Sequence, residues 1–430
     1  MNKYTKKIKS FIDDNLYTEP IKKYEDNNVI KNIKELFEEI HNKKEEYILE
    51  NTINLRKIHT YEEYPLVYMA ILDLFNKNKL KLEFDPNNFS EFVKWFRENL
   101  KDINLEHMLI DSEYYDILFN PPKERELLHE LLYSNIFISL DVIQHIESED
   151  LIYNIYKQDN VTIHLYYPKD KELINIDLTF KIVKLYKKIF KSNKKIKLIF
   201  FLGEQKKYLP KSEYICSDNV NSGLSIKDNL IMIWRKEEFY KVLIHELTHY
   251  FGVDFYITDN IYKQLEKHFG ELINILGVDR INESYTETIA LTIHSIVYSI
   301  LNKDLNLSFD TIFNYETLFS GFQVAKILNH MNLNELSDIL SNPLKQMTSV
   351  CSYYIIKYII IKNIDLFLDF WEKNGFIVLD NQDEFKKLYI SVVNETKIKE
   401  ISLIRTIELI KQQSDDKFIK KSLRMTMFQI

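Results

Sequence analysis

The sequence predicts an α+β fold that is predominantly helical, and three observations support this fold class. Glycine and proline are scarce, at 7 and 8 residues in a chain of 430, which disfavours an all-β sandwich and low-complexity linkers. Most of the chain places apolar residues at the helical period. Three short runs at 161–167, 197–202 and 229–235 are rich in β-branched, aromatic and apolar residues, and they predict strands of a small sheet.

Residues 1–150 are expected to form a helical N-terminal domain of unknown role. Helical periodicity extends over 29–55 and again over 123–147. The Asn-Pro-Pro sequence at 120–122 predicts a break in the helical pattern. We identify no arrangement of catalytic residue types in this part of the chain, so the sequence assigns it no chemistry.

The remaining chain divides into a segment with strands, 151–258, and a segment of helices, 259–430. The first segment is expected to contain, in order, a strand, a helix, a strand, a polar loop, a strand and a helix: Val161–Tyr167, Leu173–Phe190, Lys197–Leu202, Ser217–Ser225, Asn229–Arg235 and Lys236–Tyr250. The second segment contains an apolar helical stripe at 261–273 and the most apolar stretch of the chain, Val350–Ile361. That stretch is interrupted by Lys357 and is too short to span a bilayer, so we expect a buried helix and no membrane span.

The helix expected at Lys236–Tyr250 carries the pentapeptide HELTH, an HExxH motif. Its apolar stripe consists of Phe239, Leu243, Leu247 and Tyr250. His245 and His249 are four residues apart on the neighbouring face, where their Cβ atoms lie about 5–6 Å from each other. Two imidazoles in this arrangement can hold one Zn²⁺ ion. Glu246 then lies beside the metal, where a general base for a zinc-bound water is needed.

A third metal ligand has to come from elsewhere in the chain. An HExxHxxGxxH motif would supply a third histidine, but the position that it requires is occupied by Phe255. The alternative is a carboxylate on the long helical pattern that starts at about Asn282 and runs to Leu301. Glu283 and Glu287 lie four residues apart on this pattern, so both face the same way and either can reach a metal.

With these residues the sequence resembles the gluzincins, zinc peptidases that combine HExxH with a downstream glutamate. HELTH is the form found in thermolysin, and thermolysin-like enzymes also have an Asn-Glu pair followed by a carboxylate four residues after the ligand. The resemblance implies one Zn²⁺ held by His245, His249 and Glu283, while Glu287 orients a ligating histidine. It also implies a zincin-like catalytic domain, with a small mixed sheet and the active-site helix in an upper subdomain and helices in a lower one.

The resemblance covers only the two motif helices. The interval between them is longer than in thermolysin and nearer that of clostridial neurotoxin light chains or anthrax lethal factor. The choice between Glu283 and Glu287 as the ligand therefore stays open, with Glu283 preferred. The alternative without a metal is a solvated surface helix with two histidines and a second helix with two exposed acids.

A site of this kind would hydrolyse peptide bonds. Three protein ligands leave a fourth position for water, as catalytic zinc requires. Glu246 would take the proton of this water and later pass it to the leaving amine. The oxyanion needs a further donor, for which three tyrosines are candidates alongside ordinary core roles: Tyr353, Tyr354 and Tyr285. The strand at 229–235, with Ile231 and Ile233, is expected to hold an extended peptide by edge pairing.

The first functional hypothesis is therefore a zinc endopeptidase that acts on peptides or proteins. One alternative is a catalytically inactive structural or interaction protein with a zincin fold, in which the metal only stabilises the fold. The Lys-, Asn- and Ile-rich composition resembles that of proteins from AT-rich large DNA viruses, but a purely structural site has no use for Glu246. The second alternative is an aminopeptidase, which the absence of a GxMxN motif disfavours.

Charge and cysteine content limit the partners and the compartment. The formal net charge of −7 gives no reason to expect nucleic acid as a partner. Cys216 and Cys351 are the two cysteines, too few for a disulfide framework or a cysteine-based zinc site. The N-terminus lacks the apolar region of a signal peptide, so an intracellular, cytoplasmic location is expected, with the virion as the alternative for a viral protein. The oligomeric state stays open.

Overall fold

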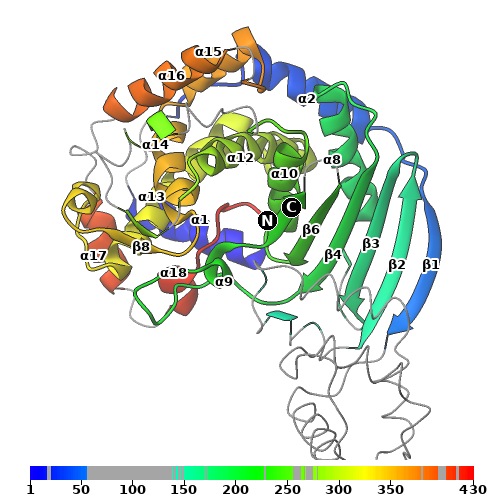
Figure 1. Cartoon of the computed structure of the whole chain (residues 1–430), viewed down its shortest axis with the longest axis horizontal. Coiled ribbons are helices and arrows are strands. Elements are labelled where there is room, and N and C mark those ends of the chain that lie inside the picture. The colour runs from blue at the N-terminus through cyan, green and yellow to red at the C-terminus, as the bar shows by residue number, and fades with distance from the viewer. Residues whose placement is uncertain are drawn as a thin grey trace, which may run out of the picture. The chain divides into compact units, whose positions relative to one another are not determined.

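The computed structural model shows a mixed α/β protein with one six-stranded mixed sheet among many helices (Figure 1), which confirms the α+β expectation. The residues that the structure describes are 1–16, 21–55, 138, 142–143, 146, 150–169, 171, 173–226, 229–254, 263–265, 267, 275–277, 279–378, 381–395, 403–412 and 416–430. The chain divides into two compact units. The larger consists of 1–51, 154–166 and 172–430, and the smaller of 52–153 and 167–171.

The six strands of the sheet lie in the order β1-β2-β3-β4-β6-β5. Their bounds are β1 Ile48–Leu55, β2 Leu151–Gln158, β3 Val161–Pro168, β4 Ile196–Gly203, β6 Leu230–Arg235 and β5 Gly223–Ile226. Strand β4 pairs in parallel with β3 and with β6, whereas β5 pairs antiparallel with β6. Strands β3, β4 and β6 are the three that the sequence predicted. All six residues of β6 are buried, as expected of an interior strand of a sheet covered by helices.

Three strands of this sheet, β1, β2 and β5, were not predicted from the sequence. The segment 29–55, expected as one helix, contains helix α2 at Asn28–His41 and then strand β1, whose neighbour β2 lies about a hundred residues later in the chain. The expected loop Ser217–Ser225 contains the short helix α9 at Ser217–Val220 and the start of β5, which pairs with the next strand, β6. Pairing with a neighbouring strand, rather than the residues of the strand itself, decides β1 and β5.

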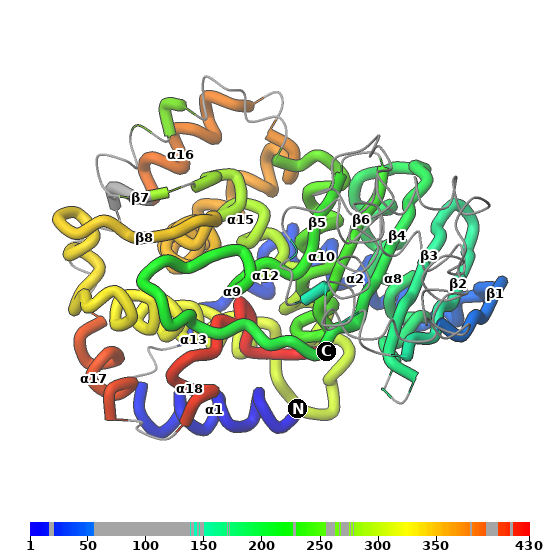
Figure 2. Tube along the Cα trace, turned by 60° about the horizontal axis from the view of Figure 1, so that its bottom comes forward, coloured from blue at the N-terminus to red at the C-terminus, as the bar shows by residue number. Residues whose placement is uncertain are grey.

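The helices around the candidate site follow the predicted segments closely. They are α8 Ile176–Ile189, α10 Phe239–Tyr250 and α12 Asn282–Leu301. The other helices among the described residues are α1 Lys3–Asn15, α13 Phe309–His330, η3 Lys303–Leu305, η4 Leu336–Leu340, η5 Cys351–Ile356, α14 Lys357–Lys362, α15 Ile364–Asn374, α16 Gln382–Glu395, α17 Ile404–Gln412 and α18 Lys417–Lys421. Figure 2 shows the same elements from another side. Among the described residues, no helix is long and apolar enough to cross a bilayer.

One expectation for the C-terminal part needs correction, and two expected helical segments lie largely outside the described residues. The part after residue 259 was expected to be wholly helical, but β7 Ile275–Gly277 and β8 Leu344–Gln346 pair in parallel as a small second sheet. The buried helix expected at 350–361 is present as η5 followed by α14. Most of the apolar stripe at 261–273, and nearly all of the helix expected at 123–147, lie outside the described residues.

Helix α12 is buried on all sides and packs against α10, which also lies beside β5 and β6. Its serine and threonine hydroxyl groups can be buried because they donate to backbone carbonyls of their own helix. These bonds run from Thr288 to Ser284, from Thr292 to Thr288 and from Ser295 to Leu291. Charged side chains on such a helix must find partners inside the protein. Residues Glu283 and Glu287 of α12 find them on α10.

Candidate metal centre

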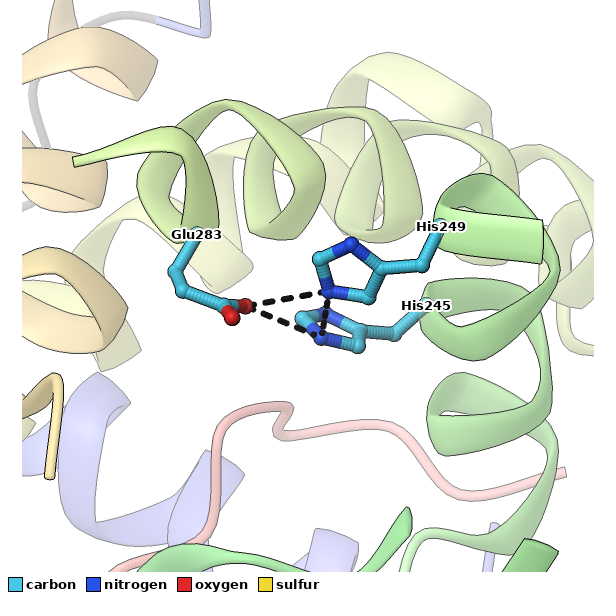
Figure 3. A group of neighbouring side chains, drawn as sticks. All are labelled: His245, His249 and Glu283. Atoms are coloured by element: carbon cyan, nitrogen blue, oxygen red, sulfur yellow. Dashed lines mark hydrogen bonds and ion pairs between the residues drawn. The ribbon is translucent and has the colours of Figure 1, made fainter. Parts of the chain in front are cut away.

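Three side chains from α10 and α12 direct ligand atoms toward one point (Figure 3). The Nε2 atoms of His245 and His249 lie 3.0 Å apart, and Oε2 of Glu283 lies 3.4 Å and 3.1 Å from them. Ligands at about 2.0–2.1 Å from a tetrahedral ion lie about 3.3–3.4 Å from one another. The three separations agree with this geometry within a few tenths of an ångström, and two imidazoles with a carboxylate are a donor set that suits zinc.

Two further carboxylates hold the imidazoles in this orientation. Nδ1 of His245 lies 2.8 Å from Oε1 of Glu287, and Nδ1 of His249 lies 2.8 Å from Oδ2 of Asp254. The amide of Asn282 donates to the same Asp254 oxygen at 2.6 Å. A proton on each Nδ1 leaves each Nε2 with a lone pair that faces the common point, which is the arrangement of metal-ligating histidines.

One turn of α12 allows two carboxylates to flank a single imidazole. Glu283 faces Nε2 of His245, and Glu287, one turn later, faces its Nδ1. The structure therefore brings Glu283, and not Glu287, together with both ligand nitrogens. Glu287 occupies the position that the resemblance implies for a residue that orients a ligand.

Buried lysines surround Glu287. The ammonium group of Lys241, one turn before His245 on α10, contacts Oε1 of Glu287, and both side chains are buried. Burial by itself would raise the pKa of the Glu287 carboxyl group, but Lys241 and His245 keep this pKa below its ordinary value. Burial lowers the pKa of Lys357, whose charge also faces Glu287, to about 8. The orienting carboxylate is thus held ionised by cations on two neighbouring helices.

The electrostatics of the three candidate ligand side chains favour charged imidazoles and a charged carboxylate. Burial favours the neutral imidazoles, yet carboxylates raise the pKa of His245 and raise that of His249 further. Burial also opposes ionisation of Glu283, but the two imidazoles hold its pKa well below the ordinary value. The surrounding carboxylates therefore favour positive charge at this point, carried by protons on the imidazoles or by a bound cation.

Glu246 lies beside the ligand atoms and lines a small cavity of about 30 Å³. Only 5% of its surface is exposed, and burial raises the pKa of its carboxyl group. Gly223 of β5 lines the same cavity, and a Cβ atom there would lie 2.6 Å from Oε1 of Glu246 and 2.9 Å from Val242. Glycine is therefore required at this point of close approach between the strand and α10.

The three candidate tyrosines do not share one location. Tyr353 lines the Glu246 cavity, and its ring centre lies 6.2 Å from that of His245. The hydroxyl of Tyr354 donates to the Leu423 carbonyl at 2.6 Å, and that of Tyr285 donates to the Phe376 carbonyl at 2.7 Å. The structure brings Tyr353 to the site and directs the other two hydroxyls elsewhere. Tyr353 belongs to η5, a π-helical turn, a geometry that is frequent at functional sites.

The expected substrate strand also needs correction. Ile231 and Ile233 are fully buried in β6, which has β4 on one side and β5 on the other. Strand β6 therefore has no edge for a peptide, and β5 is the terminal strand of the sheet on the side of the site. The sequence suggested a polar loop where β5 lies, because Gly223 and Ser225 lower its strand propensity.

Three residues of the site were missed by sequence reasoning. Asp254 follows the turn after α10, and its spacing of five residues from His249 was the available signal. Lys241 precedes His245 by one helical turn, so it shares the metal-facing side of the helix. Gly223 has no local signal, because its role depends on a contact with Glu246 across the fold.

Within the described residues, His245, His249 and Glu283 form the one group of His, Cys, Asp or Glu side chains that is spaced to hold a metal ion. His294 of α12 does not join them, and burial lowers its pKa to about 3, so it is a neutral core residue. Comparisons of the chain with models of protein families, with curated proteins and with solved structures found no match.

Proposed function

We propose that this protein is a zinc-dependent peptidase with His245, His249 and Glu283 as metal ligands and Glu246 as general base. The observation that carries the proposal is the convergence of three ligand atoms, 3.0–3.4 Å apart, beside a buried carboxylate that lines a cavity. A site that served only for stability would have no need of a fourth, uncoordinated carboxylate at that position.

The bound metal would supply an acidified water and a polarised substrate carbonyl. Glu246 accepts the proton of the attacking water at a carboxylate oxygen and returns it to the nitrogen of the departing amine. Its raised pKa suits this exchange, because a base with a pKa closer to neutrality also serves as the acid. Of the three candidate tyrosines, Tyr353 is the one that lines the cavity, so it is our candidate donor to the developing oxyanion.

The proposal includes a zincin-like catalytic domain, in which sheet and metal helix form one part and α12 with the later helices the other. Strand β5 supports this arrangement, because Gly223 brings it against Glu246 while its outer side faces away from β6. An extended peptide paired along β5 would place a carbonyl beside the general base. We therefore assign substrate pairing to β5.

The test compares Glu246→Gln with His245→Ala. Glutamine keeps the size of Glu246 but accepts no proton, so zinc content should stay near one ion per chain while peptide cleavage falls about 10²- to 10⁴-fold. His245→Ala should lose both the metal and the activity. Metal analysis and cleavage of a broad peptide library measure the two effects.

The outcomes separate the proposal from the non-catalytic alternative. Full activity of Glu246→Gln would refute the role of Glu246. Wild-type protein that binds zinc and cleaves nothing in the library would favour a structural metal site. A wild-type preference for free N-terminal residues would assign an aminopeptidase instead.

A further inference from the structure

The last part of the chain is buried although it has no regular secondary structure. The segment Ser422–Phe428 follows α18, and its residues are at most 5% exposed. In Figure 2 it continues from α18 as an irregular tube toward the C-terminus. A buried segment of this kind has to pair its backbone groups with something other than a helix or a sheet.

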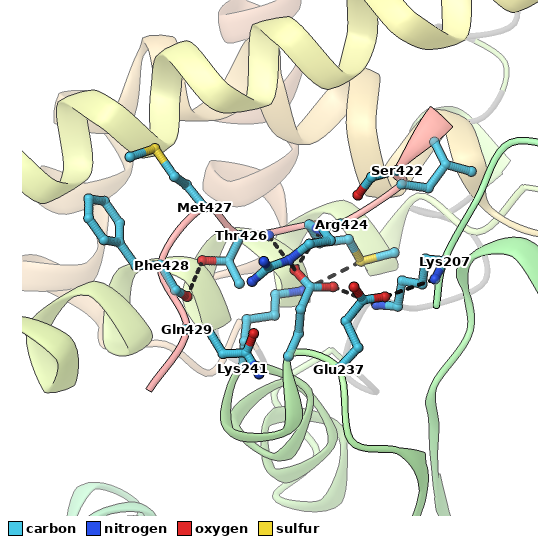
Figure 4. Close-up of polar contacts among 12 residues, drawn as sticks. Lys207, Glu237, Lys241, Ser422, Arg424, Thr426, Met427, Phe428 and Gln429 are labelled. Atoms are coloured by element: carbon cyan, nitrogen blue, oxygen red, sulfur yellow. Dashed lines mark hydrogen bonds and ion pairs between the residues drawn. The ribbon is translucent and has the colours of Figure 1, made fainter. Parts of the chain in front are cut away.

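Charged side chains from several helices pair with this backbone. Figure 4 shows residues of the segment, from Ser422 to Gln429, beside Lys241 of α10. Oε1 of Glu238 accepts from the backbone N–H groups of Met425 and Thr426, at 2.8 Å and 2.7 Å. The ammonium group of Lys357 donates to the Met425 carbonyl at 3.3 Å. Glu316 of α13 accepts from the next N–H group, that of Met427, at 3.0 Å. The backbone on both sides of Met425 is therefore held in place by buried charges.

Glu238, which holds this backbone, also belongs to α10, the helix that carries His245 and His249. Glu238 is the N-cap residue of α10, two turns before His245, and its other oxygen pairs with Lys207 at 2.9 Å. Breaking a buried ion pair leaves an uncompensated charge, which is strongly destabilising. The position of Met425 relative to the metal ligands is thus determined through one helix rather than through a surface loop.

Met425 turns its side chain into the cavity of the candidate active site. It lines that cavity together with Glu246, Val242 and Tyr353, and its sulfur lies 3.6 Å from the ammonium group of Lys241. The charges of the two lysines in the lining, Lys207 and Lys241, are already paired with carboxylates. Apolar side chains (Val220, Val242 and Met425) and polar ones (Asn221 and Ser222) share the rest of the lining, and the space of about 30 Å³ is small.

We propose that Met425 is a specificity-determining residue, which restricts the substrate position beside Glu246 to small side chains. This inference rests on the proposed peptidase function. The C-terminal segment thereby supplies one wall of the substrate site. Methionine is suited to the role because its unbranched side chain adapts to the group that it contacts.

The test compares Met425→Ala with Met427→Ala. Both methionines are buried in the same segment, but Met427 does not line the cavity, so it controls for loss of packing. Met425→Ala should raise the cleavage of peptides with large apolar residues at one position next to the scissile bond by about tenfold relative to those with alanine. Such a gain corresponds to the removal of about 1.4 kcal/mol of steric cost. Met427→Ala should keep the wild-type profile.

A second readout does not depend on turnover. Hydroxamates with methyl, isobutyl and benzyl side chains bind zinc sites, and competition with a chromophoric chelator measures their affinity for the zinc-loaded protein. Met425→Ala should gain affinity for the benzyl compound selectively. Met425→Val, which removes fewer atoms, should shift both readouts in the same direction and serves where the alanine variant fails to fold.

The outcomes distinguish the role of Met425 from the peptidase function. Identical profiles and hydroxamate affinities for folded Met425 variants and Met427→Ala would overturn the role of Met425 while the peptidase stands. Absence of both cleavage and hydroxamate binding in wild-type protein would overturn the peptidase and this inference together.

Discussion

Two buried clusters of charge lie at opposite ends of helix α10, and they differ in how their charges are matched. At the N-terminal end, Glu238 is matched by Lys207 and by backbone N–H groups of the C-terminal segment. At the C-terminal end, Nε2 of His245, Nε2 of His249 and Oε2 of Glu283 converge at 3.0–3.4 Å from one another. The carboxylate of the first cluster is matched by donors of the chain, whereas the second cluster has the form of a ligand set.

Buried polar residues that support the fold differ in this way from those that form a binding site. In a scaffold, each acceptor faces a donor of the same chain, and the pairing fixes a segment of backbone. In a metal site, acceptors face one another, and their outer nitrogens are oriented by further carboxylates such as Glu287 and Asp254. Variants of the two clusters should therefore fail in different ways.

The largest effect is expected at Glu283. Glu283→Ala removes a ligand atom, so zinc content should fall nearly to zero. Glu287→Ala removes only the partner of Nδ1 of His245, so zinc content should fall in part. Metal analysis after dialysis measures both variants. The reverse pattern, with Glu287→Ala the more severe, would make Glu287 the third ligand and Glu283 the orienting residue.

The scaffold cluster should respond in stability instead. Glu238→Ala leaves Lys207 and two backbone N–H groups without their buried acceptor, so the free energy of unfolding should fall by about 3–5 kcal/mol. Zinc stoichiometry of the folded fraction should stay at that of the wild type. Denaturant titration and metal analysis of the same sample provide the two numbers. Loss of zinc from protein that is still folded would show that the two clusters act as one.

A smaller effect is expected at Asp254, which contacts Nδ1 of the candidate ligand His249 but is not itself a candidate ligand. Asp254→Ala frees His249 from its orienting partner, so zinc affinity should fall about 10- to 100-fold with little change in stability. Asp310→Ala is the matched control, because Asp310 is likewise a nearly buried carboxylate with two donors, the backbone N–H groups of Tyr24 and Glu25, but belongs to α13. Equal zinc affinities of the two variants would remove Asp254 from the site.

Much of the fold near the site was predictable because its signals are local. Helices α10 and α12 and strands β3, β4 and β6 follow periodic apolar patterns that short-range sterics translate into structure. Strands β1 and β5 were not predicted, since a strand with mixed polar and apolar residues is decided by its neighbour in the sheet. Because β5 was not predicted, β6 was expected at an edge of the sheet, whereas β5 pairs along that edge of β6.

By itself, the sequence determined the parts of this site that one helix can express. The four-residue spacings of His245 with His249, and of Glu283 with Glu287, put each pair on one helix face whatever surrounds it. Tertiary structure alone decided which carboxylate meets both imidazoles, that Asp254 orients His249, and that Met425 lines the cavity. Met425 and Lys241, which are in contact, lie 184 positions apart, and such contacts arise from packing, which has no period that a sequence can display.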